Sequence, residues 1–429
     1  MLSSLVSFYL EGIPINLNIT KLPKIDPSSV KGVQIKKIRN EVPDFPGNVL
    51  TSNCYTPFAM DSSVPGIVRE KSIYYKFPNV YFNDVEIFQK NQMINHKYRH
   101  IPEMGEYRFS HTVLDRVVYL LCTYEQYGHV VHDGMLTALF NIPWDVIRNS
   151  TLVIRRNLKI AKKAIDHLEI PYGNYLFMEP NTTYFCRELH MVSPNYQCGS
   201  QQYSTLYVRD YVYKHFNLTG IKPINGLMFN RKLTSRGRHI ENFNEFRIEI
   251  PKRYPNINWI DINDKQLTNY SYSLKILAAT KYFFSVSGSA CYNIMYMQPY
   301  TGIAVIGSDI YDWLPMTNSV AWKIWYAYAV NPHIPHFPSE TQLSFNVSVE
   351  YNLKYLDKLI YAVDHQRWPK LEDNSMAIVF DTKTMRDIVK IDDDVDFRMT
   401  KGLNTIRLVY ESYQPKNYSS MFNEIINIQ

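Results

Sequence analysis

Short apolar runs alternate with longer amphipathic segments from about residue 105 to residue 216. The apolar runs are rich in β-branched and aromatic residues, as is typical of strands covered on both faces. They predict strands at residues 117–122, 151–155, 175–178 and 189–192. The amphipathic segments repeat their apolar positions every three or four residues, which predicts helices at residues 126–140, 158–167 and 205–216. Alternating strands and helices indicate a mostly parallel sheet with helices on both faces.

The same pattern starts again after residues 217–225, which contain Gly220 and Pro223 and form the best candidate for a domain boundary. Beyond it the sequence predicts strands at residues 227–229, 258–262, 282–286 and 302–306. It predicts helices at residues 242–252, 270–280, 291–297, 319–329 and 350–363. The predicted fold class is therefore α/β, with two Rossmann-like domains that face one another across a cleft.

With 429 residues the chain has room for two or three domains. Frequent prolines and short aromatic runs at residues 72–77 and 79–82 predict an irregular region with short strands over residues 1–104. We divide the remainder into one α/β domain at residues 105–220, a second at residues 221–345, and a helical extension with a tail at residues 346–429.

A net charge of +6 is mild for this length; it suits an enzyme of anionic substrates and is too weak to indicate nucleic-acid binding. The sequence contains no apolar run of roughly eighteen residues, so we expect no membrane span in this chain. Residues 1–10 are apolar, but they lack a basic start and meet Glu11 at once, which does not fit a signal peptide. We therefore expect either a cytosolic protein or one whose targeting segment lies outside this sequence.

Glycosylation sequons and cysteines bear on the compartment. Asn-x-Ser/Thr occurs at Asn18, Asn149, Asn181, Asn217, Asn269, Asn346 and Asn417, which favours a secretory lumen slightly. The five cysteines form no Cys-x-x-Cys pair, which argues against a cysteine zinc site. Cys186 and Cys198 flank a loop-like segment and could form a disulfide if the compartment is oxidising.

A basic cluster follows the short predicted strand at residues 227–229. It consists of Arg231, Lys232, Arg236, Arg238 and His239, and Asn242 and Glu245 after it have the spacing of a helix capping box. In an open α/β sheet, ligands bind at the carboxyl ends of strands, and the planar fork of arginine suits a phosphate. The cluster therefore predicts either a diphosphate site, with Arg231, Lys232 and Arg236 as its main cations and Arg238 and His239 facing solvent, or a solvated basic loop.

A histidine pair follows the predicted strand at residues 117–122. His129 and Asp133 are four residues apart, and on a helix they share a face, with His132 nearby. A histidine oriented by a carboxylate is suited to accept a proton near neutral pH. The alternatives are a histidine satisfied within the packing of helix on sheet and a metal site, for which no fourth ligand stands out. We expect no metal.

The turn Ser287-Gly288-Ser289-Ala290 follows another predicted strand and precedes a predicted helix that contains Asn293. Small residues let the backbone approach a ligand, and a helix N-terminus points N–H groups at an anion. A turn that is packed tightly for steric reasons has the same appearance. Because this turn and the basic cluster follow strands of one predicted sheet, both could bind one diphosphate.

Three segments, in this order and spacing, resemble glycosyltransferase family 61, the DUF563 group. Gln126-Tyr-Gly-His-Val-Val-His-Asp133 is similar to the family's Asn-x-x-His-x-x-x-Asp segment. Arg209-Asp210, followed by Asn230-Arg-Lys and residues 236–245, resembles its arginine-rich strand-end motif. Residues 284–301, with Ser287-Gly-Ser-Ala-Cys-Tyr-Asn293, resemble its Gly-x-His-Gly-Ala-Gly-x-x-Asn segment.

The resemblance implies a GT-B fold and an inverting glycosyltransferase. Such an enzyme moves a sugar from a nucleotide donor, usually linked to UDP, to a hydroxyl of a protein or glycan, without a required metal or cofactor. The resemblance also implies residence in the lumen of the endoplasmic reticulum or Golgi. His129, with Asp133 and His132, would serve the acceptor, while Arg231, Lys232, Arg236, Ser287, Gly288, Ser289 and Asn293 would bind the nucleotide sugar.

Two departures from the family pattern leave a second function open. Ser287 stands where the family has histidine, and Ala290 replaces a glycine. The family also has a glutamate after the next strand, whereas Val305-Ile-Gly307 offers no carboxylate. The alternative is an inactive relative that is retained as a carbohydrate- or nucleotide-binding module.

Overall fold

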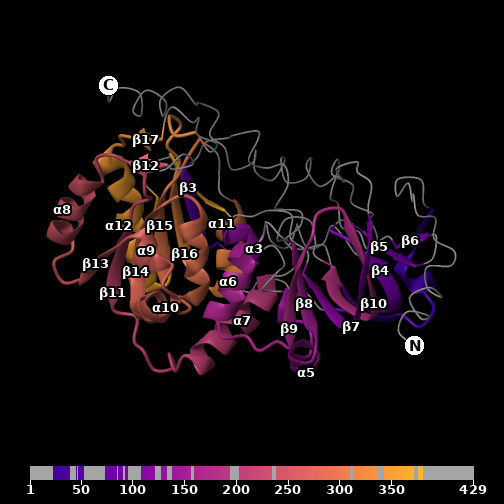
Figure 1. Cartoon of the computed structure of the whole chain (residues 1–429). Helices are drawn as coiled ribbons and strands as arrows, with labels where there is room; N and C mark the ends of the chain where they lie inside the picture. Colours follow the sequence, from indigo (N-terminus) through magenta and orange to yellow (C-terminus); the bar gives the residue numbers. More distant parts are fainter. Residues whose placement is uncertain are drawn as a thin grey trace. The chain divides into compact units, whose positions relative to one another are not determined.

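The computed structural model (Figure 1) divides the chain into two compact units, residues 1–40 with 70–208 and residues 41–69 with 209–429. The residues that the structure describes are 23–38, 45, 47–52, 73–84, 86–89, 92–94, 108–120, 127–132, 138–155, 159–193, 202–233, 238–309, 313–335, 343–371 and 375–379. Among these residues, no helix combines the length and apolar character needed to cross a membrane.

The first unit is built on a nine-stranded mixed sheet. Along one path its strands are β1 (Lys24–Ile25), β6 (Gln92–Ile94), β5 (Ile87–Gln89), β4 (Ile73–Phe82), β10 (Thr182–Ser193), β7 (Arg108–Leu120), β8 (Thr151–Arg155) and β9 (Asn174–Met178), with β2 (Gln34–Lys37) paired to β4. The strands from β10 to β9 run parallel, whereas β4 is antiparallel to β10. The parallel half is the part that carries helical connections.

Three helices accompany these parallel strands: α3 (Tyr127–His132), α5 (Trp144–Arg148) and α6 (Lys159–His167). In α6 the buried residues Ala161, Ala164 and Ile165 form one face. Leu152, Val153 and Ile154 of β8 are all buried, so side chains on both faces of that strand are covered. This covering explains why an uninterrupted apolar run, rather than an alternating one, marks the strand in the sequence.

The N-terminal region joins the same sheet. The two strands expected at residues 72–77 and 79–82 form one strand, β4, which continues through Pro78 and Asn79 and pairs with β10 over most of its length. The structure thus places this part of residues 1–104 in one sheet with the strands of residues 105–220.

The second unit contains a seven-stranded sheet. Its strand order is β13 (Trp259–Ile262), β11 (Asn225–Phe229), β14 (Thr280–Val286), β15 (Gly302–Ile306), β16 (Trp325–Ala329), β3 (Val49–Ser52) and β18 (Met376–Val379). All neighbours are parallel except β18, which is the antiparallel edge. The chain passes from β11 outward to β13, then returns across β11 to β14 and continues the other way. The winding therefore reverses between β11 and β14.

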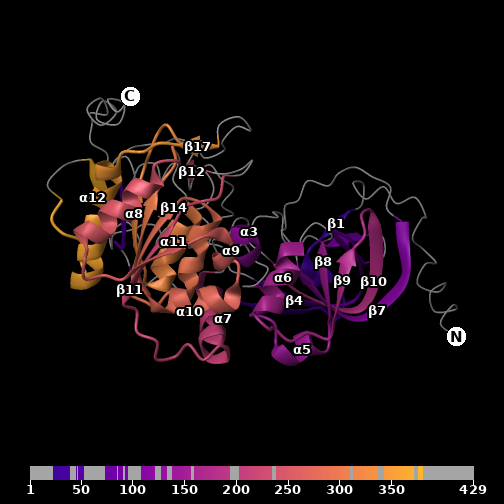
Figure 2. The same cartoon turned by 60° about the vertical axis from the view of Figure 1, so that its left-hand side comes forward.

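Helices cover both faces of this sheet (Figure 2). They are α8 (Phe243–Arg253), α9 (Asp264–Leu267), α10 (Tyr270–Ala279), the 3₁₀ helix η5 (Ser289–Tyr296), α11 (Trp313–Trp322) and α12 (Val349–His365). On one face, α12 buries Leu353, Leu356 and Leu359 against Phe284 and Ala304 of the central strands. A further helix, α7 (Gln202–His215), spans the division between the two units.

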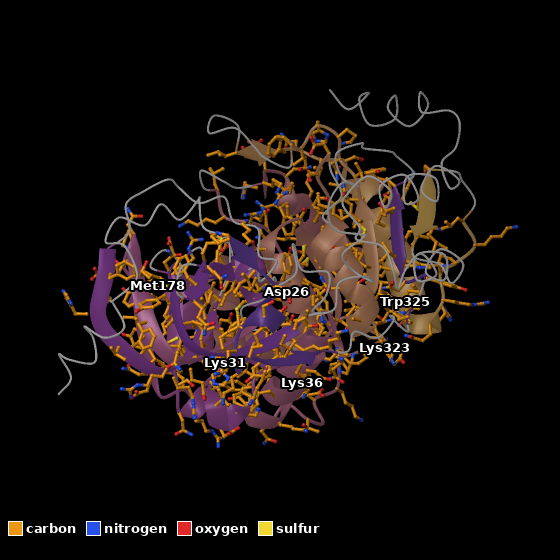
Figure 3. The ribbon with its side chains drawn as sticks, turned by 90° about the vertical axis from the view of Figure 1, so that its right-hand side faces the viewer. Asp26, Lys31, Lys36, Met178, Lys323 and Trp325 are labelled. Carbon is orange, nitrogen blue, oxygen red and sulfur yellow. The ribbon has the colours of Figure 1, made fainter. Side chains whose placement is uncertain are left out.

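The helix expected at residues 319–329 is wrong in its second half. α11 ends at Trp322, Lys323 adopts a φ of 57°, and residues 325–329 form the buried strand β16. Lys323 and Trp325 are labelled in Figure 3. Trp325-Tyr-Ala-Tyr-Ala329 is apolar at every position, so it has no period that separates a buried strand from a buried helix. Pairing with β15 and β3 selects the strand.

Two local expectations also fail. Asn242 makes no side-chain cap for α8; instead its amide donates to the Val347 carbonyl at 2.9 Å and its oxygen accepts from the Val347 N–H at 3.1 Å. The expected capping box therefore does not form there, although Asn263 and Gln266 form one at α9. The segment expected as an α-helix from residue 291 is η5, a 3₁₀ helix.

The disulfide expected between Cys186 and Cys198 does not form in the structure. Cys186 is free and buried in β10, and its Sγ lies 3.7 Å from the Val80 carbonyl of the neighbouring strand. Burial raises the pKa of its thiol well above its ordinary value. Cys198 lies outside the described residues. Cys186 thus packs as a small apolar side chain within the sheet.

Candidate functional site

The loops after β11 and β14 begin at the point where the second sheet reverses its winding. β11 and β14 are neighbours, with Phe229 in register with Ser285, so Asn230 and Ser287 leave the same edge of the sheet side by side. In doubly wound sheets the crevice outside the carboxyl ends of two such strands is the usual place for a ligand. The candidate site is therefore built on these two loops.

Asn230 closes the loop that follows β11. Its amide nitrogen donates to the Ile240 carbonyl at 2.8 Å, and its oxygen accepts from the Ile240 N–H at 3.1 Å. His239 adds a 2.5 Å contact from Nδ1 to the Arg231 carbonyl. Because a carbonyl only accepts, Nδ1 of His239 is the donor in this contact. These bonds join the two ends of the loop and leave Arg231 and Arg238 at its base.

β12 (His239–Ile240) gives this loop a second support. It pairs in parallel with β17 (Ser344–Phe345), a short strand more than a hundred residues away in the sequence. Ile240 and Phe345 are both buried in the core of the second unit. The loop after β11 is thus anchored to the body of the unit at both ends.

Two guanidinium groups approach the Gly288 turn. Arg231 donates from Nη1 to the Ser287 carbonyl at 3.2 Å. Gly288 has a φ of 135°, and a Cβ placed on it would overlap Arg231 Nη1 and lie 3.1 Å from Nη2 of Arg238. Glycine is therefore needed here both for its backbone conformation and for the room that it leaves to the arginines. Gly288 is also the N-cap of η5, so two cationic side chains and a helix start meet at one turn.

The two arginines are less exposed to solvent than an ordinary pair of surface arginines. Arg238 is 8% exposed, and Arg231 is partly buried. The expectation that Arg238 and His239 face solvent is wrong, because the β12–β17 pairing draws this segment into the fold. Charges held at low exposure act through a lower dielectric and interact more strongly with an anion than solvated ones do.

The other residues expected in this site fall into different places. Ser287 is fully buried, and its N–H donates to the Ile306 carbonyl at 2.9 Å. Asn293 is 5% exposed and donates to the Ala290 carbonyl at 3.0 Å, which braces the first turn of η5. Gly288 and Ser289 form the start of η5. The turn expected to approach an anion is therefore present, with Asn293 behind it as a support.

The remaining expected cations differ in exposure and placement. Lys232 has an exposed side chain, and its N–H donates to Asp264 Oδ2 at 3.0 Å. Arg236 lies outside the described residues. Arg209 of α7 instead has a structural role: it donates to the carbonyls of Met297 at 3.5 Å and Trp322 at 3.2 Å. Only Arg231 and Arg238 are placed at the glycine turn by the described contacts.

A carboxylate does lie at this edge beyond β15. Val305 to Gly307 offers none, but Asp309 follows three residues after the strand ends, and its N–H donates to the Ile334 carbonyl at 2.7 Å. It is partly buried. Asp309 lies two residues beyond Gly307, so the absence of a carboxylate in Val305-Ile-Gly307 does not leave this strand end without one.

In the first unit, the candidate base follows the carboxyl end of β7. His129 and His132 lie on α3, as the helical spacing predicts, and α3 begins at Tyr127. The structure describes the backbone of this helix, and Asp133 lies outside the described residues. The pairing of His129 with Asp133 therefore stays a prediction.

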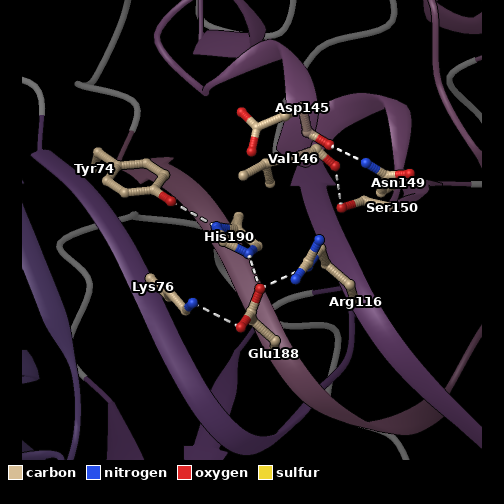
Figure 4. Close-up of polar contacts among 9 residues, drawn as sticks. All are labelled: Tyr74, Lys76, Arg116, Asp145, Val146, Asn149, Ser150, Glu188 and His190. Atoms are coloured by element: carbon tan, nitrogen blue, oxygen red, sulfur yellow. Dashed lines mark hydrogen bonds and ion pairs between the residues drawn. The ribbon is translucent and has the colours of Figure 1, made fainter.

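A polar network in the first unit was not expected (Figure 4). His190 Nε2 lies 2.7 Å from Glu188 Oε1, and His190 Nδ1 lies 2.6 Å from the hydroxyl of Tyr74. Glu188 also binds Lys76 Nζ at 2.7 Å and Arg116 Nε at 2.6 Å. The residues come from β4, β7 and β10. The sequence carried one signal for this network. Polar residues stand at positions 74 and 76 of one strand and at 188 and 190 of another, and they alternate with apolar residues.

The charges in this network define its protonation. Burial lowers the pKa of His190 and outweighs the opposing effect of Glu188, so the ring is neutral near pH 7. Burial would raise the pKa of Glu188, but its bonds to Lys76, His190 and Arg116 lower it to about 2. Burial, with Glu188 and Asp145 nearby, raises the pKa of Tyr74 to about 12. Tyr74 therefore donates to His190, and His190 donates to the Glu188 carboxylate.

The comparisons with known proteins agree with the resemblance seen in the motifs. The family model described as Glycosyltransferase 61 matches residues 127–304, from the first residue of α3 into β15. This span contains both the histidine helix and the arginine–glycine turn. The class of protein is thus a glycosyltransferase. Residues 127–304 form a glycosyltransferase family 61 domain. No curated protein matches it in sequence.

Proposed function

We propose that this glycosyltransferase is an inverting, metal-independent enzyme that moves a sugar from a UDP-linked donor to a hydroxyl of a protein or glycan. The proposed donor site rests on one observation. Arg231 and Arg238 approach Gly288 at the point where the winding of the second sheet reverses. Two partly or fully buried guanidinium groups beside a helix start are suited to a diphosphate, which offers several oxygens to paired donors.

The chemistry of an inverting transfer explains the need for these cations. The acceptor oxygen forms a bond to the anomeric carbon from the face opposite the leaving group. The bond between that carbon and the diphosphate oxygen breaks, and its electron pair leaves with the diphosphate. Arg231, Arg238, Lys232 and Arg236, with the backbone of Gly288 and Ser289, would stabilise the negative charge that develops there.

The acceptor hydroxyl must lose its proton in the same reaction. His129 is the proposed base, with Asp133 orienting its ring and His132 beside it in the sequence. Its place on α3, the next described helix after β7 in the parallel part of the first sheet, supports this assignment. We propose that the two units form a GT-B arrangement, with the acceptor on the first and the nucleotide sugar on the second. We also propose that the enzyme acts in the lumen of the endoplasmic reticulum or Golgi.

The donor site is tested by UDP binding to arginine variants, measured by calorimetry. Charge-assisted hydrogen bonds contribute about 1.5–3 kcal/mol each, so Arg231→Ala is expected to weaken binding by about 10- to 100-fold. Arg238→Lys should weaken it as well, because a lysine cannot reproduce the planar fork.

Arg247→Ala is the matched control for both arginine variants. Arg247 lies on α8 of the same unit and pairs with Asp261 at 3.0 Å on the surface. UDP affinity unchanged in both site variants would exclude the proposed site. Release of UDP from UDP-sugars by the unaltered enzyme would identify the donor.

A further inference from the structure

Five of the seven Asn-x-Ser/Thr sequons lie within the described residues, and the asparagine is exposed in each. These are Asn149, Asn181, Asn217, Asn269 and Asn346. Asparagine is also buried in this fold, at Asn48, Asn83, Asn293, Asn318, Asn331 and Asn352, and none of these begins a sequon. An exposed asparagine is a position at which the folded protein can accommodate a glycan. All five of these sequons therefore lie where modification is compatible with the fold.

Asn181 and Asn217 differ from the other three in their side-chain contacts. Asn181 lies in the turn between β9 and β10, and Asn217 lies two residues beyond α7. Neither shows a side-chain hydrogen bond to any described residue. In contrast, Nδ2 of Asn149 donates to the Asp145 carbonyl at 2.8 Å, and Nδ2 of Asn346 donates to Glu241 Oε2 at 3.0 Å. At Asn269 the side-chain oxygen accepts from Ser271 at 2.9 Å.

Turn geometry accounts for asparagine at both positions but not for the threonine that follows. The φ angles of Asn181 and Asn217 are 51° and 52°, in the left-handed region that asparagine tolerates well. Asn79 has the same conformation, at 50°, and is also exposed, yet Tyr81 stands two residues after it. Thr219, two residues after Asn217, is exposed, and its side chain makes no hydrogen bond to any described residue. The sequon supplies a reason for that hydroxyl that the fold does not.

We propose that Asn181 and Asn217 are modified by N-linked oligosaccharides. In that reaction Nδ2 of the asparagine forms a bond to the anomeric carbon of an oligosaccharide carried on a lipid diphosphate. The bond from that carbon to the diphosphate breaks, the lipid diphosphate leaves with the electron pair, and the amide loses one proton. Transfer takes place on the chain as it is made, so the burial of Thr183 in the finished fold does not oppose it. The glycans then extend from exposed turns into solvent.

The modification also predicts a location for the chain that catalysis does not require. It places both units in contact with a glycosylating lumen, since Asn181 belongs to the first unit and Asn217 to the second. The modification does not depend on which sugar donor or acceptor this enzyme uses, because here the chain is the substrate of another enzyme. Loss of transferase activity would leave it unchanged.

The test is mass spectrometry of the full-length protein purified from its natural cells. A glycosidase that cuts the amide link converts each occupied asparagine to aspartate, and heavy-oxygen water marks that conversion. Both Asn181 and Asn217 are expected to carry the mark. Asn181→Gln and Asn217→Gln should each make the protein migrate faster in gel electrophoresis by the mass of one glycan. The control Asn79→Gln should leave its migration unchanged. Unmarked asparagine at both positions, or marks confined to Asn149 and Asn346, would overturn the proposal.

Discussion

Arg231 reaches across from β11 to the loop after β14 and donates to the Ser287 carbonyl at 3.2 Å. The next residue, Gly288, leaves the space in which this guanidinium lies. The guanidinium of Arg231 can therefore lie there only because Gly288, the residue after Ser287, has no side chain. Replacement of that glycine tests the proposed donor site without removal of any charge.

Gly288→Ala is expected to weaken UDP binding by about tenfold or more, because the new methyl group displaces Arg231. It should also destabilise the fold by about 1–3 kcal/mol, since a non-glycine residue at this φ is strained. Gly220→Ala is the matched control: its φ is 93°, and nothing lies within 4 Å of the added Cβ. That variant should show backbone strain alone. Equal UDP affinity in the two variants would contradict the steric argument.

His129→Ala is expected to lower turnover by about 10²- to 10⁴-fold, the usual contribution of a general base. UDP affinity should be retained, because the donor is assigned to the second unit. Asp133→Asn should give a smaller loss of turnover. His365→Ala is a suitable control, since His365 packs on Tyr361 in the last turn of α12. Normal turnover in the His129 variant would remove the base from this helix.

The Glu188 network makes the first unit sensitive to acid. The pKa of Glu188 is about 2 in the folded protein and near 4.5 in the unfolded chain, so its contribution is complete above about pH 4.5 and is lost as pH falls towards 2. At pH 7 we expect Glu188→Gln to cost about 2 kcal/mol of unfolding free energy, measured in urea. Asp115→Asn, which breaks the exposed pair with Arg187, should change it by less than ~0.5 kcal/mol. A difference between the two variants that persists unchanged at pH 2 would refute the linkage.

His190 adds a separate acid-sensitive step at higher pH. Because its pKa is lowered in the fold, the unfolded chain binds a proton below about pH 6.5 that the folded protein does not bind. Stability is therefore expected to fall as pH drops below this value. Tyr74→Phe should cost about 1–3 kcal/mol by leaving Nδ1 of His190 without its donor. Tyr75→Phe, on the opposite face of β4, is the control; an equal loss in both would mean that the hydroxyl of Tyr74 contributes nothing specific.

Central parallel strands of both sheets could be located from the sequence because they are buried on both faces. Gly302-Ile-Ala-Val-Ile306 and Thr151-Leu-Val-Ile-Arg155 are examples, and both are strands at the predicted positions. The same property explains the failure at residues 325–329. An apolar run records burial but not conformation, and the pairing with Val49–Ser52 that decides it is distant in the sequence.

The site was predictable as far as local sequence determines it. Arg231 and Gly288 follow directly from strands, so the order of elements places them at one edge. Arg238 was missed because a basic residue in a loop has the composition of solvated surface. Its burial depends on the pairing of His239–Ile240 with Ser344–Phe345, and nothing in the sequence around Arg238 indicates that partner.

The position of β3 has a practical consequence for any shortened form of the protein. This strand, at residues 49–52, lies between β16 and β18 in the sheet that carries the arginine–glycine turn, and both its neighbours come late in the chain. A fragment cut to the family match at residues 127–304 would lack β3, β16 and β18 together. The cut would also shorten β15 to residues 302–304, and what remains of it would expose an unpaired backbone edge, which promotes aggregation. The sheet that carries the arginine–glycine turn can be completed only after residues 49–52 and 376–379 have both been synthesised.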